Sequence, residues 1–128
     1  MTKLTRNQQR VDQVIFVTGF PGWLGTSLIE VLTNANHPFP KRFNKYPRRE
    51  IRCLVLPQFI KWLRPRPNVK YITGDLTNPA TYQEALKGVD TVFHMAGLIH
   101  PRRIGDLYKI NTEGTKNLVE AARRAGVG

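Results

Sequence analysis

Three glycines at regular spacing, Gly19, Gly22 and Gly25, are the residues of this chain best suited to bind an anion. They follow an apolar run at residues 13–18 and precede a segment, 23–33, whose apolar residues recur at helical spacing. A glycine turn between a strand and a helix leaves N–H groups free at the start of the helix, where phosphates bind. The order strand, glycine turn, helix therefore predicts a cradle for the pyrophosphate of a nucleotide.

Each of the three glycines has its own physical role in such a cradle. Gly19 permits the tight turn off the strand, Gly22 leaves room for the pyrophosphate, and Gly25 lets the helix lie close to the strand. A turn of this composition that binds nothing is the alternative. The pattern is not a P-loop, because no GxxxxGK[ST] run is present and no Lys follows the glycines.

The elements that must position this turn alternate between strand and helix along the whole chain. This alternation is typical of a parallel α/β sheet. A cap at Thr77 or Asn78 and a terminating Gly126 mark helix ends. Strands are expected at 13–18, 51–56, 69–73 and 89–94, and helices at 23–33, 58–64, 79–86 and 105–125.

Length and composition describe one domain at most, with 128 residues of which 41% are hydrophobic. Residues 1–12 are expected to form a polar N-terminal extension without the apolar run of a signal peptide, and residues 13–128 to form the binding domain. No stretch approaches the roughly 18 apolar residues of a membrane helix, so no membrane partner is expected. The single cysteine, Cys53, excludes a disulfide within the chain and favours a cytoplasmic location.

The charge balance is strongly basic, with 20 Lys and Arg against nine Asp and Glu and a net charge of +11. Most of the excess lies in residues 41–49 and 61–66, where Phe43, Tyr46 and Trp62 alternate with the cations. A solvated basic loop, a contact to a nucleotide phosphate and a nucleic-acid surface that stacks bases on these aromatic rings all fit the pattern. Nucleic acid is the least favoured of the three.

Four motifs together carry a family likeness. In chain order they are Thr18-Gly19-x-x-Gly22-x-x-Gly25, Gly74-Asp75-Leu76-Thr77, Asp90-Thr91-Val92-Phe93-His94-x-Ala96-Gly97 and Asn111-Thr112-x-Gly114-Thr115-x-Asn117. Their order and spacing resemble the N-terminal half of the extended short-chain dehydrogenases/reductases, the NAD(P)-dependent epimerase/dehydratase family. The resemblance implies a Rossmann-like, doubly wound parallel sheet with strand order 3-2-1-4. It also implies an NAD(P) cofactor and, in an intact relative, hydride transfer at a carbonyl or hydroxyl carbon, often of a nucleotide sugar or a steroid.

The resemblance assigns the pyrophosphate to the glycine turn. Gly19, Gly22 and Gly25 would hold it together with the backbone of Trp23 and Leu24, at the start of the helix.

The remaining cofactor contacts would come from the later motifs. Asp75 would accept a hydrogen bond from the adenine amino group, and Leu76 would line the adenine pocket. Ala96 and Gly97 would let the cofactor ribose pass close to the end of the fourth strand. Asn111 would interrupt the long helix and help to order a catalytic lysine. The alternatives are that Asp75 caps a turn and that Asn111 faces solvent.

Cofactor preference depends on the end of the second strand, where an NAD enzyme places Asp or Glu on the ribose 2′-hydroxyl. Residues 55–58 contain no carboxylate, and the Arg that commonly reads an NADP 2′-phosphate is absent at Leu56. Lys61, Arg64 or the pair Arg48-Arg49 could supply the positive charge instead. We expect either NAD or NADP to bind, with NADP slightly favoured.

Catalytic residues are not expected in this chain. The family uses a Tyr-x-x-x-Lys pair and a Ser or Thr, and none of the four tyrosines here has a Lys four residues later. His94 and His100 lack partners for a metal site. We therefore expect a sheet that stops after about four strands and does no chemistry alone.

The fourth strand of such a sheet has an open edge, at Val92 and Phe93, that favours self-association. The alternatives to this functional interpretation are a non-catalytic nucleotide-binding or regulatory module completed by a partner chain, and a basic nucleic-acid-binding domain.

Overall fold

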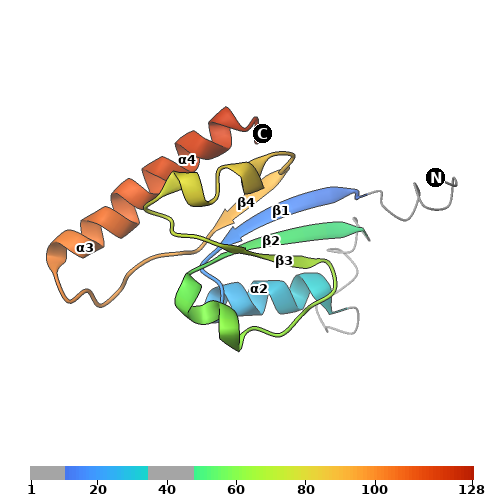
Figure 1. The fold of residues 1–128 in the computed structure, drawn as a ribbon, viewed down its shortest axis with the longest axis horizontal. Helices are drawn as coiled ribbons and strands as arrows, with labels where there is room; N and C mark the ends of the chain where they lie inside the picture. Colours follow the sequence, from blue (N-terminus) through green and yellow to red (C-terminus); the bar gives the residue numbers. More distant parts are fainter. Residues whose placement is uncertain (1–10, 35–47) are drawn as a thin grey trace, which may run out of the picture.

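A four-stranded parallel sheet forms the centre of the computed structural model, which describes residues 11–34 and 48–128 (Figure 1). Its strands are β1 (Gln13–Thr18), β2 (Arg49–Val55), β3 (Val69–Thr73) and β4 (Thr91–His94). They lie in the order β3-β2-β1-β4, and every neighbouring pair is parallel. The α/β class and the order 3-2-1-4 are confirmed.

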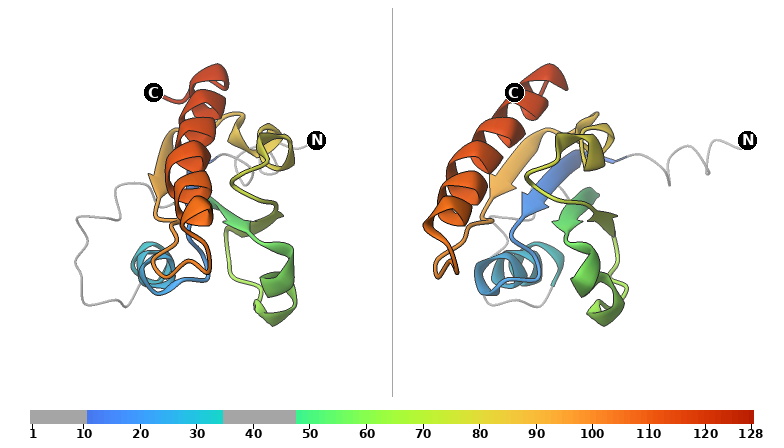
Figure 2. Two further views of the ribbon diagram at one scale, coloured as in Figure 1. Left: turned by 90° about the vertical axis from the view of Figure 1, so that its left-hand side faces the viewer. Right: turned by 60° about the vertical axis from the view of Figure 1, so that its left-hand side comes forward.

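Helices cover both faces of this sheet, as a doubly wound fold requires (Figures 1 and 2). On one face lies α2 (Trp23–Thr33), and on the other lies the helix at the end of the chain. That helix is continuous and has three parts, α3 (Ile104–Tyr108), the π-helical η5 (Lys109–Glu113) and α4 (Gly114–Arg124). Short 3-10 helices follow β2 and β3, namely η2 (Pro57–Trp62), η3 (Pro79–Thr81) and η4 (Glu84–Leu86).

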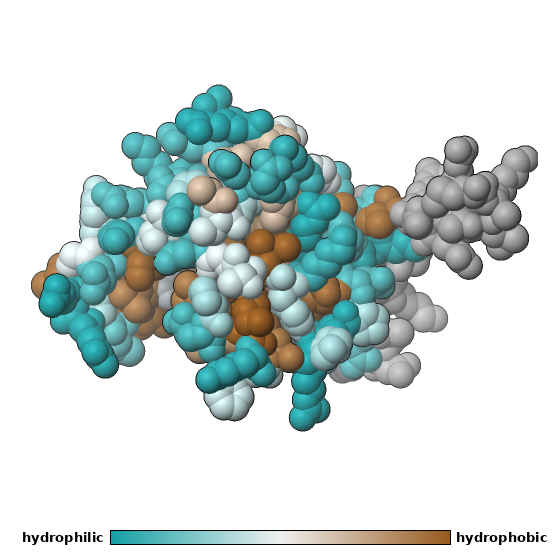
Figure 3. Space-filling model, in the orientation of Figure 1, coloured by the Kyte–Doolittle hydropathy of each residue, from teal (hydrophilic) through white to brown (hydrophobic). Residues whose placement is uncertain are grey.

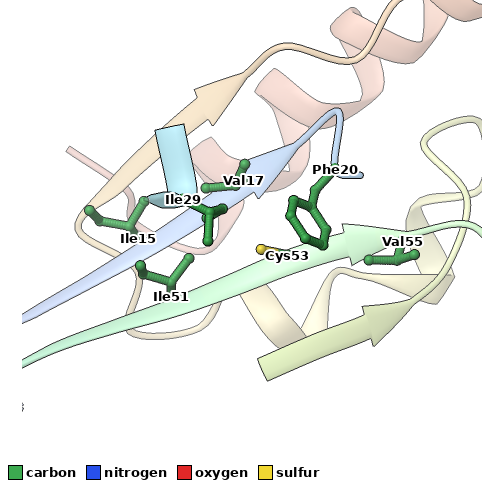
Figure 4. Close-up of a cluster of buried hydrophobic side chains, with 7 residues drawn as sticks. All are labelled: Ile15, Val17, Phe20, Ile29, Ile51, Cys53 and Val55. Carbon is green, nitrogen blue, oxygen red and sulfur yellow. The ribbon is translucent and has the colours of Figure 1, made fainter. Parts of the chain in front are cut away.

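The core is divided into two clusters because successive strand residues point to opposite faces. Ile15 and Val17 of β1 pack with Ile29 of α2 in the first cluster (Figure 4). Phe16, between them in sequence, packs with Leu118 of α4 in the second. Burial on both faces explains why these strands read as continuous apolar runs.

Cys53 belongs to the first cluster and is fully buried. Burial raises the pKa of its thiol to about 12, so it stays protonated and acts as a small hydrophobic side chain.

Among the described residues, no helix is long and apolar enough to cross a membrane.

Element ends differ from the sequence-based expectation by a few residues at β2, β4 and the last helix. The clearest cause is at the start of β4, where Asp90 bonds to β1 through its side chain. Val14 N donates to Asp90 Oδ2 at 2.8 Å, while Asp90 N donates to Val14 O at 2.9 Å. The carboxylate thus replaces a ladder bond, and β4 begins at Thr91.

The expected helix over residues 79–86 is wrong, because two separate 3-10 turns, η3 and η4, occupy this segment. Tyr82 lies between them with a φ of −135°. Its ring is 1% exposed, and its hydroxyl donates to Leu76 O at 3.1 Å. Burial of this one ring overrides the local helical preference. Asn78 precedes η3 without a capping side-chain bond.

Gly25→Ala tests how closely α2 packs against the end of β1. A Cβ at Gly25 would lie 2.4 Å from the carbonyl oxygen of Gly19, a backbone atom that cannot rotate away. We expect the free energy of unfolding to fall by about 1–3 kcal/mol in urea titrations. Gly105→Ala is the matched control, because it lies in α3 with nothing within 4 Å of the added Cβ. It should leave stability unchanged or raise it, by up to about 1 kcal/mol.

Candidate nucleotide-binding site

A cavity of about 620 Å³ opens at the carboxyl ends of the strands, where ligands bind in doubly wound sheets. Figure 3 shows hydrophobic residues at the surface in the middle of the face where Figure 1 shows the sheet. Six of the ten predicted cofactor residues line this cavity. They are Gly19, Gly22, Asp75, Leu76, Ala96 and Gly97.

The first wall of the cavity is the glycine turn. Gly19 has a φ of +89°, and a Cβ there would lie 2.7 Å from the carbonyl carbon of Met95. Gly22 N donates to Gly19 O at 2.9 Å, and a Cβ at Gly22 would lie 2.7 Å from the same oxygen. Neither Gly19 nor Gly22 therefore has space for a side chain.

The start of α2 is open to an anion. Gly22 is the N-cap and supplies no side chain, and the first turn contains no acidic residue. The first N–H groups of a helix have no partner within it and carry its positive dipole end. Trp23 and Leu24 begin the helix with side chains 88% and 58% exposed, while Gly25 is buried behind the turn. These three residues do not line the cavity, and their backbone forms the start of the helix.

Asp75 stabilises the turn after β3, which agrees with the alternative that this residue caps a turn. Its Oδ1 accepts hydrogen bonds from the N and the Oγ1 of Thr77, both at 2.8 Å. An ionised carboxylate has two acceptor oxygens, so this turn does not exclude a second bond to a ligand. Leu76, next to it, is 7% exposed and reaches both the cavity and the second core cluster.

Asn111 lies behind the cavity, in the π-helical η5, and does not line it. Its side-chain amide bonds twice to one residue. Oδ1 accepts from Leu98 N at 2.7 Å, and Nδ2 donates to Leu98 O at 2.9 Å. Asn111 therefore fixes the loop that leaves β4, although the residue itself is exposed to solvent.

A partly buried hydrogen-bond cluster that the sequence did not reveal joins the ends of β1 and β4. Thr18, 1% exposed, places its Oγ1 3.1 Å from both Met95 N and Ala96 N and 2.6 Å from His94 Nδ1. His94 Nε2 lies 2.8 Å from Thr115 Oγ1 on α4. Burial lowers the pKa of His94. Thr18 and His94 stand in the motifs quoted above, but nothing in the sequence indicates that they touch.

The wall at the end of β2 is apolar, because Leu56 and Phe59 line the cavity there. Of the described acidic side chains, Asp75 and Asp106 reach the cavity, and neither is on this wall. Lys61, in η2, holds its ammonium 5.0 Å from the ring centre of Trp62.

The suggested contribution of Arg48 and Arg49 to a phosphate contact is wrong. Both lie at the amino end of β2, whereas the cavity lies at the carboxyl ends of the strands. Arg49 Nε donates to Gln13 Oε1 at 2.9 Å, and Arg48 Nε lies 3.5 Å from Asp12 Oδ2. The rest of the basic segment up to residue 47 lies outside the described residues. In the described ranges no group of three His, Cys, Asp or Glu side chains could hold a metal ion.

Comparison with known proteins agrees with this geometry. The NAD dependent epimerase/dehydratase family matches residues 15–128. A 3-beta-hydroxysteroid dehydrogenase from Mycolicibacterium neoaurum is 31% identical over 121 residues, which cover 88% of this chain and 29% of the relative.

Solved structures share the fold. The crystal structure of gox2253 is 33% identical with a TM-score of 0.69, covering 91% of this chain and 32% of that one. A uronate dehydrogenase mutant from Agrobacterium tumefaciens complexed with NAD is 23% identical with a TM-score of 0.67, covering 89% and 37%. The chain thus spans about a third of the length of the proteins it matches.

The lowered pKa of His94 predicts a pH-dependent stability. Because the unfolded chain binds the imidazole proton more readily than the folded one, the free energy of unfolding should fall as pH drops below 6.5, the ordinary value. The loss ends once pH passes below the folded-state pKa. Urea titrations at several pH values measure it, with His94→Asn as the reference that lacks this proton. Equal pH dependence of the two proteins would contradict the expectation.

Proposed function

Because the chain belongs to the NAD dependent epimerase/dehydratase family, we propose that it is the dinucleotide-binding part of an oxidoreductase of the extended short-chain type. The observation that carries this proposal is the cavity itself, in which an uncapped helix start meets a glycine turn at the strand ends. A bound nicotinamide dinucleotide supplies a hydride acceptor or donor for an alcohol or carbonyl carbon.

The glycine turn is the proposed pyrophosphate site. Gly19 and Gly22 bring no side chain to the turn, and Gly25 brings α2 close behind it. The backbone of Trp23 and Leu24 then presents N–H groups to the anion. The absence of an acidic residue from the first turn of α2 supports this role, since a carboxylate there would compete with phosphate.

The adenosine half of the cofactor is proposed to lie along the β3 and β4 ends. Asp75 accepts the adenine amino group, and Leu76 forms the floor beneath the ring. Ala96, with only a methyl group, and Gly97, with no side chain, leave room where the ribose passes. Asn111 acts on this site through Leu98, by fixing the loop after β4.

We propose NADP rather than NAD as the preferred cofactor. The support is the apolar wall of Leu56 and Phe59, where an NAD enzyme needs a carboxylate for the ribose 2′-hydroxyl. Lys61 in η2 and the exposed Arg64 follow β2 and would pair with a 2′-phosphate, whereas Arg66 is already paired with Glu30.

The substrate of the complete reaction is proposed to be a secondary alcohol or its ketone. A relative that carries the name 3-beta-hydroxysteroid dehydrogenase favours a steroid-like alcohol over other classes. No tyrosine of this chain has a lysine four residues later, so no proton-transfer group is assigned here.

Calorimetric titration with NADPH and NADH tests both the function and the preference. We expect saturable binding of both and tighter binding of NADPH. Lys61→Gln and Arg64→Gln should each weaken NADPH by about two- to fivefold and leave NADH unchanged, because only NADPH has the extra phosphate. Lys116→Gln, exposed on α4, removes the same charge away from the cavity and is the control. Lack of binding of either cofactor would overturn the proposed function, and tighter NADH binding would overturn the preference alone.

We further propose that β4 pairs with a second copy of the chain. In the described structure β4 bonds to β1 alone, and Phe93 on it is 38% exposed. Sedimentation velocity should therefore show concentration-dependent dimers, and Phe93→Lys should abolish them by placing a charge on the strand. Val119→Lys, on the exposed face of α4, is the control and should leave dimers intact. A monomer at all concentrations would contradict this proposal.

A further inference from the structure

The hydrogen-bond cluster around His94 has one consistent arrangement of hydrogens. Thr18 Oγ1 lies within bonding distance of two backbone N–H groups, those of Met95 and Ala96, which can only donate. A hydroxyl oxygen has two lone pairs, so both are taken. The hydroxyl hydrogen of Thr18 must then point to His94 Nδ1, which lies 2.6 Å away and has to be an acceptor.

The same reasoning continues from His94 to the last helix. With Nδ1 as an acceptor, the neutral ring carries its hydrogen on Nε2 and donates it to Thr115 Oγ1. Thr115 Oγ1 in turn donates to Asn111 O at 2.7 Å, in the π-helical η5. Each hydroxyl or ring hydrogen in this chain of bonds meets one acceptor. The direction of this chain is therefore fixed from the end of β1 to η5.

This chain of bonds reaches the nucleotide cavity through Met95 and Ala96. Both residues line the cavity, and their backbone forms the surface against which the Gly19 turn packs. We propose that His94 is a positioning residue for the dinucleotide site, whose neutral Nε2–H form keeps Thr18 as the acceptor that fixes the Met95–Ala96 backbone. This inference rests on the function proposed above and adds to it a residue that does not itself line the cavity.

Protonation of His94 changes the arrangement. Nδ1–H would then face the hydroxyl hydrogen of Thr18, and two donors would oppose each other at 2.6 Å. Thr18 can accept from Nδ1–H only by giving up one of its backbone donors. Met95 N has a second acceptor, Thr18 O at 3.3 Å, so the group that loses its partner is Ala96 N–H. The wall of the cavity beside Gly19 then loosens.

Burial, and not a neighbouring charge, lowers the pKa of His94. Strand β1 has no titratable side chain, and its contact is Thr18. On η5 and α4 the contact is Thr115, and the nearby charged residues of these segments, Lys109, Glu113 and Lys116, are exposed. None of the three contributes to the shift.

The first test is nuclear magnetic resonance of the 128-residue chain labelled with nitrogen-15, without and with NADPH. Two-bond proton–nitrogen spectra distinguish the Nε2–H from the Nδ1–H tautomer. We expect His94 to be neutral with its hydrogen on Nε2, and its pKa to fall further when NADPH binds, because binding and proton release are reciprocally linked. An Nδ1–H tautomer would overturn the proposal without any variant.

The second test measures NADPH affinity by calorimetry from about pH 8 to about pH 5. Affinity should fall as pH drops through the His94 pKa, and this step should be absent in His94→Asn.

Thr115→Val keeps the side-chain shape but removes the acceptor of Nε2–H, and it should weaken NADPH binding by about three- to tenfold. Thr115→Ser retains the hydroxyl and should bind like the unmodified chain. Thr112→Val, exposed in η5, is the control for a change of threonine in the same segment.

The outcomes separate this inference from the proposed function. If the tautomer is Nε2–H but no dinucleotide binds, the function fails and the hydrogen-bond direction stands. If NADPH binds with the same pH dependence in the unmodified chain and in His94→Asn, the positioning role is wrong and the function stands. An unchanged His94 pKa on NADPH binding would also contradict the positioning role.

Discussion

The crowding of backbone around the carbonyl of Gly19 is the constraint on which the rest of the site depends. Gly22 donates to this oxygen, and both Gly22 and Gly25 approach it so closely that neither has space for a Cβ. On the other side, the Cα of Gly19 packs against the backbone of Met95. Strand β1, helix α2 and the end of β4 therefore meet with no intervening side chains. The uncapped start of α2 can lie at the mouth of the cavity because this contact holds it there.

Local sequence was sufficient to predict the elements whose conformation no single tertiary contact overrides. The apolar run at 13–18 and the helical spacing at 23–33 gave correct bounds, because the first is a strand buried on both faces and the second packs one apolar face on the sheet. The segment 79–86 failed because Tyr82 leaves helical geometry to bury its ring and bond to Leu76 O. A single tertiary contact decided that conformation, and the spacing of residues along the chain does not predict this contact.

The site divides in the same way between what sequence can and cannot predict. Glycine positions were informative because backbone geometry alone requires them. The Thr18–His94 contact joins residues 76 apart, and the His94–Thr115 contact joins residues 21 apart. The first depends on the register that places Thr18 opposite His94, and the second depends on the packing of α4 against the sheet. Neither the register nor this packing follows from residue types, so these contacts emerge only from the fold.

The two walls beside the start of α2 consequently differ in physical character. The glycine turn is held by backbone contacts and by missing side chains, which no change of protonation alters. The β4 wall is held by the hydroxyl of Thr18, whose hydrogen must point toward His94 for Ala96 N–H to have an acceptor. The described residues contain no buried side-chain polar atom without a hydrogen-bond partner, and Thr18 Oγ1 is the acceptor that the structure gives to Ala96 N–H. A proton on His94 therefore acts directly on the β4 wall, and it reaches the glycine turn only through the packing of Gly19 against the Met95 backbone.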